Sequence, residues 1–295
     1  LILAMTPQKQ IQIPLLQNVQ LSPQVCTKLQ ALGLNLSPAT AISNNLLCRS
    51  PNNLFATLLS RVKIDSYSYV MPKSVVRNTS IGKYCSIGHS VEIGIPQQNF
   101  SCLSASNVFT LNSDFKERTG SIKRLDPFAR AQGDEVARIT IGNDVWVGAG
   151  VYIQGGVNIG SGAIIGTGSY ICNDVPPYAI VGGRDGGENS KGIIKRYRFS
   201  DEVISDLLDL KWWEFDLPRL MASLQDTSYR IPFEDPKAFI AFMRNADTAY
   251  WPRTNQQWHY IVPQNTSQVQ VIPVGENFDM GHDYPAELLK DSSWN

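Results

Sequence analysis

The stretch that decides the fold runs from Ile141 to Pro176, IGNDVWVGAGVYIQGGVNIGSGAIIGTGSYICNDVP, where an aliphatic residue recurs at every sixth position. Neither an α-helix nor a single β-strand repeats every six residues. A coil of three short parallel strands does, because each side of a triangular prism takes one hexad. Each aliphatic residue then points into the core, and the following glycine, asparagine or aspartate accepts the tight corner. The predicted core residues are Ile141, Val147, Ile153, Ile159, Ile165 and Ile171, together with Val145, Val151, Val157, Ala163 and Ser169.

The predicted fold class is therefore mainly β, a left-handed parallel β-helix. The earlier stretch VVRNTSIGKYCSIGHSVEIG has the same phase, with Val75, Ile81, Ile87 and Ile93 in the core positions. Polar and charged sequence over residues 95–138 separates the two blocks of coils. Such a long excursion from a solenoid typically projects from one face and carries binding function, the alternative being a tolerated surface insertion.

The repeat divides the chain into four segments. Residues 61–198 are the predicted β-helix with its excursion loop, and residues 199–228 are a predicted helix that starts at the N-cap candidate Ser200 and packs on the prism. The flanks, residues 1–60 and 229–295, are predicted to be extensions separate from the repeat. Within them we expect helices in SPQVCTKLQALGL and around residues 235–245, and a strand in VQVIPV. The predicted buried stripe of the helix after Ser200 is Val203, Ile204, Leu207, Leu208 and Leu210.

Composition limits the classes of partner. The 295 residues are 43% hydrophobic and 18% charged, which is typical of a soluble protein with a sizeable core. A net charge of zero without basic or acidic blocks gives no reason to expect nucleic acid or an anionic membrane as a partner. No apolar run approaches the roughly 18 residues of a membrane span, so the expected location is the cytoplasm. Five cysteines without a CxxC pair indicate reduced thiols and no structural zinc.

Four pieces of the chain, in order, carry a resemblance to a known family. They are DSYSYV leading to IGKYCSIG, the hexads from IGNDVW to IIGTGS, DVPPYAIVGG, and KRYRFSDEVISDLLDLKWWEFDLPRL. Together they cover about residues 65 to 224 and resemble the xenobiotic acetyltransferases of the hexapeptide-repeat superfamily, which include streptogramin and type B chloramphenicol acetyltransferases. The resemblance implies a homotrimer with active sites between prisms, acetyl-CoA or another acyl-CoA as co-substrate without a metal, and a small-molecule, natural-product or sugar hydroxyl as acceptor.

In the family a histidine of the excursion loop removes the proton of the acceptor hydroxyl, and N–H groups of the coils stabilise the oxyanion. The corresponding stretch here, GIPQQNFSCLSASNVF over residues 94–109, contains no histidine. Alignment places the family's histidine at Gln98, Asn99 or Phe100. Neutral amides are not general bases near pH 7, so this loss would remove a contribution of roughly 10²- to 10⁴-fold.

The chain offers other candidates for the base. His89 sits at a corner one coil before the loop, and its alternative role is an exposed turn residue. His259 comes next, although both it and His282 belong to the C-terminal extension, where a structural role or exposure is the alternative. Cys102, within the loop, is a candidate nucleophile, or an inert thiol because no base adjoins it in sequence.

The resemblance also implies a binding site for the co-substrate. The family's pantetheine arm follows small residues of the late coils, and its phosphates meet basic residues just past the prism. The first set is matched by Gly148, Ala149, Gly166, Thr167 and Gly168, and the second by Lys191, Lys195 and Arg196. The alternative for the basic set is a solvated surface stretch. Trp146 and the pair Trp212-Trp213 are predicted to be packing residues.

Two functions fit this sequence. One is an O-acyltransferase. The other is a catalytically degenerate protein with the same trimer, which serves as a binding or structural partner in a biosynthetic assembly, and the missing loop histidine favours it. A carbonic anhydrase on the same prism needs three histidines on neighbouring coils, and only His89 lies on a coil.

Overall fold

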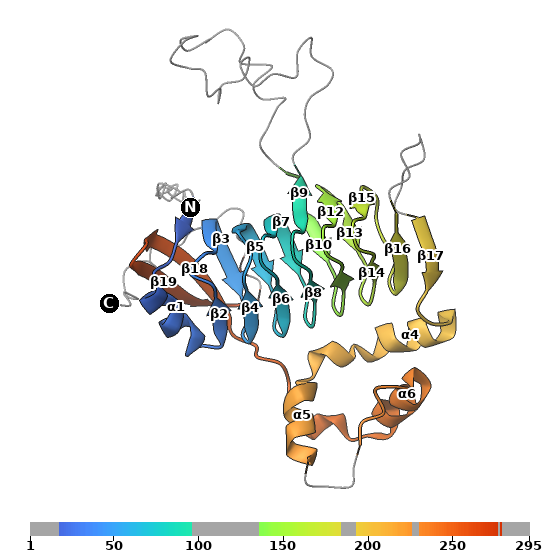
Figure 1. Ribbon diagram of the computed structural model, residues 1–295. Helices are drawn as coiled ribbons and strands as arrows, with labels where there is room; N and C mark the ends of the chain where they lie inside the picture. Colours follow the sequence, from blue (N-terminus) through green and yellow to red (C-terminus); the bar gives the residue numbers. More distant parts are fainter. Residues whose placement is uncertain (1–17, 96–135, 184–192, 226–229, 277, 279–295) are drawn as a thin grey trace, which may run out of the picture.

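The fold is a parallel β-helix, as predicted, in a computed structural model that describes residues 18–95, 136–183, 193–225, 230–276 and 278. The strands stack into two hydrogen-bonded ladders along the solenoid (Figure 1). Sheet 1 has the order β15-β12-β9-β7-β5-β3-β18-β19, with β10 and β13 beside it, and sheet 2 the order β17-β16-β14-β11-β8-β6-β4-β2. The solenoid strands are β2 (Leu34–Leu36), β3 (Ala41–Cys48), β4 (Asn52–Leu54), β5 (Leu58–Ile64), β6 (Ser68–Val70), β7 (Val75–Ile81), β8 (Ser86–Ile87), β9 (Glu92–Ile95), β10 (Ile139–Ile141), β11 (Trp146–Val147), β12 (Tyr152–Gln154), β13 (Asn158–Ile159), β14 (Ile164–Ile165), β15 (Tyr170–Ile171) and β16 (Ala179–Gly182).

Both predicted sets of core residues between positions 141 and 171 point inward, and none is more than 3% exposed. The cross-section has three faces although the ladders are two, because long strands of sheet 1 bend across a corner. The bends fall at Arg61 in β5 and Asn78 in β7, both in the left-handed region with φ of 53° and 43°. Each coil therefore follows the triangular course that the hexads indicate.

Early and late coils differ in length. Trp146 lies opposite Ile164, 18 residues on, whereas Leu58 lies opposite Val75, only 17 residues on. The predicted phase is confirmed at Ile81, Ile87 and Ile93, but at the short side of the earlier coil Val76 is buried instead of Val75. The reason is that the side between Val76 and Ile81 takes five residues rather than six.

The β-helix begins within the segment that the sequence predicted to be a separate N-terminal extension. β2 pairs in parallel with β4, and β3 with β5, so the boundary at residue 61 does not mark the start of the solenoid. Coils one residue short had hidden these rungs from a search for period six. The helix predicted nearby is α1 (Pro23–Gln30), with Ser22 as its N-cap, and β1 (Val19–Gln20) pairs antiparallel with β3.

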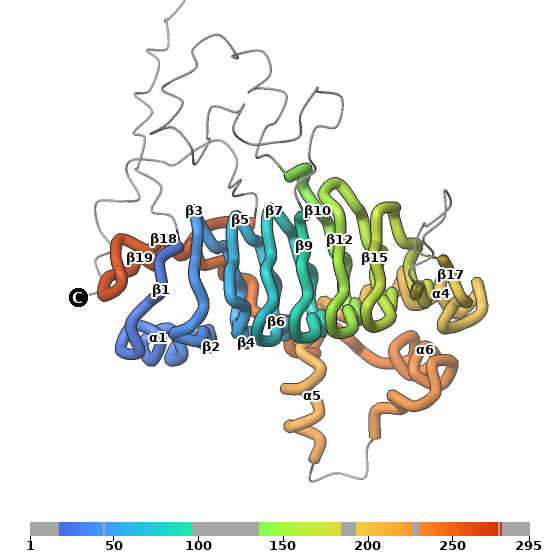
Figure 2. Tube along the Cα trace, turned by 45° about the horizontal axis from the view of Figure 1, so that its top comes forward, coloured from blue at the N-terminus to red at the C-terminus, as the bar shows by residue number. Residues whose placement is uncertain are grey.

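The excursion leaves the ladder intact. β9 ends at Ile95, and β10 pairs in parallel with β7 before it and β13 after it, so the chain resumes on the next rung (Figure 2). Most of the predicted excursion, residues 96–135, lies outside the described residues. The connection falls at the corner that Asn78 forms in the preceding coil.

The predicted helix over residues 199–228 is broken. α4 (Asp201–Leu210) ends at Lys211, whose φ of 46° is left-handed, and α5 (Leu217–Leu224) begins after Asp216. Val203 and Leu207 of the predicted stripe are buried, and its other members pack around them. With η3 (Trp212–Glu214), α6 (Pro236–Asn245) and η4 (Thr248–Tyr250), these helices form a helical cap along one side of the solenoid (Figure 1); α6 is the helix predicted around residues 235–245.

The C-terminal extension returns to the first coils. β18 (Trp258–Asn265) and β19 (Gln268–Val274), which includes the predicted strand VQVIPV, form a hairpin, and β18 pairs antiparallel with β3. The hairpin covers the edge that the first rung of sheet 1 would otherwise expose. At the other end β17 (Ile193–Tyr197) pairs antiparallel with β16 and ends sheet 2.

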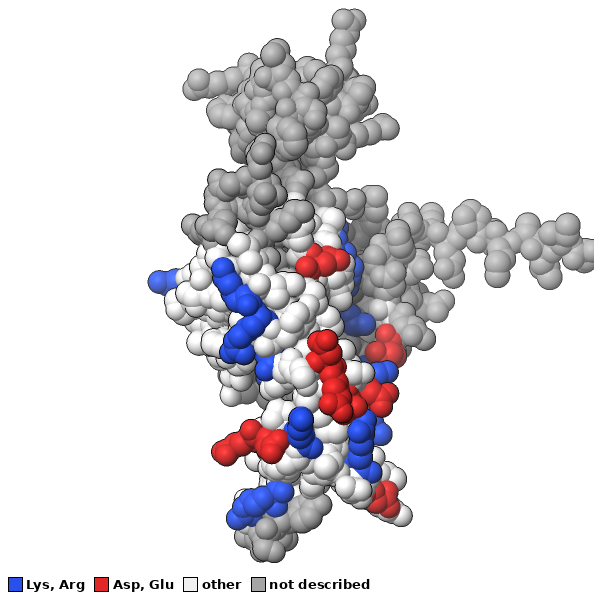
Figure 3. Space-filling view, turned by 90° about the vertical axis from the view of Figure 1, so that its right-hand side faces the viewer, with Lys and Arg blue, Asp and Glu red and all other residues white. Residues whose placement is uncertain are grey.

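The surface carries no dominant charge at the β17 end of the solenoid, where basic and acidic side chains are interspersed (Figure 3). Across the described ranges, no helix is long and apolar enough to cross a membrane. The same residues include no group of three or more His, Cys, Asp or Glu side chains that could hold a metal ion.

Candidate functional site

Two corners of the prism have different surroundings. The helical cap covers the one that we call the cap corner, where Tyr67 and Tyr84 stack with ring centroids 5.0 Å apart and donate to Asp216 and to the carbonyl of Phe215. The second is built from glycines and small residues, and we call it the glycine corner. The cap corner consists of residues 65–67, 82–84, 142–144 and 160–162, and the glycine corner of residues 88–90, 148–150 and 166–168.

One column of the glycine corner unites most of the predicted site residues. The N–H of Gly150 donates to the carbonyl of His89 at 3.0 Å, and the N–H of Gly168 donates to that of Ala149 at 2.8 Å. The strand registers on either side agree with these bonds, so His89, Ala149 and Thr167 occupy the same position on successive coils. The candidate base and the predicted co-substrate residues therefore share one edge of the prism.

The glycines of this corner are there for two physical reasons. A Cβ on Gly148 would lie 2.7 Å from the backbone nitrogen of Thr167, so the coils could not approach with a side chain there. Gly150 and Gly168 have φ of 64° and 71° and nothing within 4 Å of a Cβ position, so they are needed for backbone conformation, not for lack of space. The result is a strip of bare backbone that faces outward.

His89 is exposed on this strip. Its Nδ1 lies 3.4 Å from the hydroxyl of Ser90, and the next side chain in its column is the methyl group of Ala149. An exposed turn residue and a base open to a second substrate would both have this geometry. The structure therefore locates the candidate at the predicted corner without assigning its role.

Lys195 reaches the far end of the same column. The register between β14 and β16 places Gly183 one rung beyond Thr167, and the Nζ of Lys195 lies 3.7 Å from a Cβ position on Gly183. Three rungs separate His89 from Gly183, which at about 4.8 Å each span roughly 14 Å. Arg196 lies opposite Ile180 and donates to the carbonyl of Tyr197 at 3.3 Å.

Other predicted residues are not brought to this corner. Gln98, Asn99, Cys102, Lys191 and His282 lie outside the described residues, as does Phe100. The remaining histidine, His259, lies opposite Cys48 in the hairpin that covers the first coils, and burial lowers the pKa of its imidazole. Within one chain, His259 and the glycine corner occupy different parts of the solenoid.

Trp146 differs from its prediction. It is 54% exposed on the outer face of sheet 2, because Val145 and Val147 on either side point inward. Trp213 is buried in the helical cap as predicted, and Trp212 packs against Tyr84 with ring centroids 5.2 Å apart.

Comparison with known proteins agrees with this architecture. The family model of the bacterial transferase hexapeptide (six repeats) matches residues 138–173. A chloramphenicol acetyltransferase of Escherichia coli is 37% identical over 164 residues, which cover 54% of this chain and 71% of the relative. The chain belongs to the xenobiotic acetyltransferase family.

Other members of this xenobiotic acetyltransferase family match over the same share. A probable macrolide acetyltransferase of Lysinibacillus sphaericus is 36% identical over 148 residues, covering 49% of this chain and 74% of that protein. Among solved structures, a hexapeptide-repeat acetyltransferase of Vibrio cholerae complexed with acetyl coenzyme A is 21% identical. It covers 52% of this chain and 72% of the other, with a TM-score of 0.36, too remote to bear on the site.

Sequence reasoning did not find that Lys195 meets the column of His89. The contact depends on the antiparallel return of β17 along β16, which no periodic pattern announces. Gly183, by contrast, could have been found, because GG after AIV continues the small residues that follow IIG and VGA in the two preceding coils.

Proposed function

We propose that this chain transfers an acetyl or other acyl group from CoA to a hydroxyl of a small molecule, natural product or sugar. The family membership and the names of the relatives support acetyl transfer. The observation that carries the proposal is the column of His89, Ala149, Thr167 and Gly183, with Lys195 at its far end. It combines a titratable group, a strip of bare backbone and a cation.

The residues present fit an acyl-CoA. The extended pantetheine arm is narrow, and the small residues of the column leave room for it along the coils. Lys195 is placed to meet a phosphate by charge-assisted hydrogen bonding. In this arrangement the thioester lies towards His89 and the nucleotide towards the β17 end.

His89 is the proposed general base. Its imidazole takes the proton of the acceptor hydroxyl while the hydroxyl oxygen bonds to the thioester carbon. The C–S bond then breaks, and the imidazolium returns the proton to the departing CoA thiolate. No acyl-enzyme forms, and the imidazole ends in its starting state.

A homotrimer is part of the proposal. Trp146, Ile164 and Ile180 lie opposite one another on successive rungs of sheet 2 and face outward as an apolar ladder beside the glycine corner. Such a surface favours burial against a second copy. The groove between two prisms would then enclose the column of His89.

We expect the protein to have three times the chain mass in light scattering at micromolar concentration. Replacing Trp146 by serine should shift the population towards smaller species, because Trp146 is the largest exposed side chain of the ladder. Ser86→Ala, on the neighbouring rung, is the matched control and should leave the mass unchanged. A monomeric wild-type protein would contradict a shared site.

Replacing Lys195 by alanine should weaken CoA binding about fivefold, as expected for an exposed ion pair, and flatten its salt dependence. Isothermal titration at two salt concentrations measures both effects. The exposed Lys237 of the helical cap provides the control, and Lys237→Ala should bind CoA like the wild type. An unchanged dissociation constant in Lys195→Ala would assign Lys195 to the solvated surface.

The alternative, a degenerate family member with a binding or structural role, rests on the absence of histidine from residues 94–109. Titration with acetyl-CoA followed by an assay for released thiol separates the two. Binding with turnover on hydroxyl acceptors supports the transferase. Binding of CoA without turnover on any acceptor class supports the alternative.

A further inference from the structure

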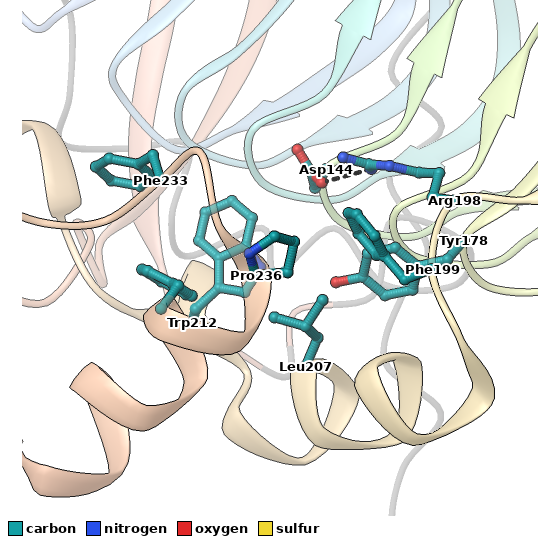
Figure 4. Close-up of a pocket in the computed structure, with 9 residues that line it drawn as sticks. Asp144, Tyr178, Arg198, Phe199, Leu207, Trp212, Phe233 and Pro236 are labelled. Carbon is teal, nitrogen blue, oxygen red and sulfur yellow. Dashed lines mark hydrogen bonds and ion pairs between the residues drawn. The ribbon is translucent and has the colours of Figure 1, made fainter.

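A pocket of about 200 Å³ opens between the cap corner and the helical cap, away from the glycine corner. The solenoid contributes Asp144 and Tyr178, and the helical cap contributes Leu207, Trp212 and Phe239 (Figure 4). For scale, an apolar cavity of about 150 Å³ binds benzene. The pocket therefore has room for a molecule of one aromatic ring.

Tyr178 presents an unpaired polar group to this pocket. Its side chain is 1% exposed, and its hydroxyl has no hydrogen-bond partner among the described residues. The hydroxyl points into the space beside Leu207 and Pro236 (Figure 4). The neighbouring Trp212 lies close enough to affect the pKa of Tyr178 but does not meet hydrogen-bond geometry. A buried hydroxyl left without a partner costs free energy, and a ligand can recover it.

The ring of Tyr178 is held in place from two sides. A Cβ on Gly162 would lie 2.4 Å from the Tyr178 ring, so only glycine leaves room for it there. Arg198 lies over the other side, 5.4 Å from the ring centroid. The hydroxyl is thus presented by a preorganised ring. Burial raises the pKa of Tyr178 to about 12, so the group keeps its proton at neutral pH and can donate.

The charges of the pocket are already paired. Arg198 donates to Asp144 at 3.0 Å and to the carbonyl of Gly162 at 2.8 Å. This pairing leaves little net charge to attract an ion, and the remaining lining is mostly aromatic: Tyr178 lies 5.7 Å from Phe199, and Phe233 lies 5.6 Å from Phe239, between ring centroids. A neutral aromatic ligand suits this lining better than an anion or a sugar.

We propose that this pocket is a binding site for a small neutral phenol-like molecule, whose ring packs among the aromatic side chains and whose hydroxyl accepts a hydrogen bond from Tyr178. The site is separate from the column of His89 and does not depend on acyl transfer. A ligand there contacts the solenoid and the helical cap together, so it stabilises the folded chain against unfolding of the cap.

The test uses p-cresol and toluene, which differ by one hydroxyl, with the full chain and its Tyr178→Phe variant. Isothermal titration of the wild type should show tighter binding of p-cresol than of toluene. In Tyr178→Phe the affinity for p-cresol should fall roughly fivefold and that for toluene should stay the same, as expected for loss of one hydrogen bond. Tyr250→Phe, at a side chain that is 87% exposed, is the matched control and should bind both probes like the wild type.

Stability without ligand gives a second measurement. Because the hydroxyl of Tyr178 has no partner, Tyr178→Phe should be at least as stable as the wild type in thermal unfolding. p-Cresol should raise the melting temperature of the wild type more than that of the variant. Absence of p-cresol binding to the wild type, or equal affinity for p-cresol in both proteins, would overturn the proposal.

Discussion

Replacing His89 by alanine is expected to lower kcat/KM for acetyl transfer at least about 100-fold, because general-base catalysis typically contributes 10²- to 10⁴-fold. His89 shares its column with Ala149 and Thr167 and is exposed to an acceptor. CoA binding and oligomeric mass should not change, since the side chain supports neither. Steady-state kinetics with a hydroxyl acceptor, run beside a CoA titration, measures the effect.

Two further variants sharpen this prediction. His89→Gln keeps a polar side chain without a base and should lose as much activity as alanine. Ser90→Ala removes only the hydroxyl 3.4 Å from Nδ1 and should cost less than about tenfold. Full activity in His89→Ala would make His89 a turn residue. Introducing histidine at Gln98 or Asn99 would then show whether the family's position still supports transfer.

The hexads were enough to predict the late coils but not the early ones. From Ile141 to Ile171 every aliphatic residue predicted to be in the core is buried, because six residues per side keep the pattern in phase. Where Leu58 pairs with Val75 a coil has 17 residues, and one missing residue shifts the inward position to Val76. A period search therefore ended where the coils shorten, while the physical ladder continued to β2.

The candidate site could be predicted in part. The small residues of the glycine corner were evident from the family pattern, and the corner position of His89 followed from its place in the repeat. The alignment of His89 with Ala149 depends on the strand register across the excursion, which the residues between Ile95 and Ile139 conceal in the sequence. The meeting of Lys195 with Gly183 depends on an antiparallel return, and such tertiary pairing has no local signal.

The cap corner depends on a buried charge network. Asp65 pairs with Arg49 at 3.2 Å and with Lys83 at 3.6 Å, and the two cationic side chains are only 3% and 5% exposed. Lys83 also contacts Glu214 of η3 at 2.9 Å, so the network joins the early coils to the helical cap. Asp65 is the shared carboxylate, and its other oxygen accepts from the N–H of Ser66 at 2.7 Å.

Asp65→Asn should lower the free energy of unfolding by about 3 kcal/mol, because it leaves two buried cations facing a neutral amide. Urea unfolding followed by circular dichroism measures the change. The matched control is Glu92→Gln, which breaks the 2.9 Å pair between Glu92 and Arg77 on the solenoid surface, where both side chains are about one-third exposed. That variant should lose less than about 1 kcal/mol. Equal losses in the two variants would mean that the network stabilises the chain no more than a surface ion pair, and that apolar packing alone holds the helical cap to the solenoid.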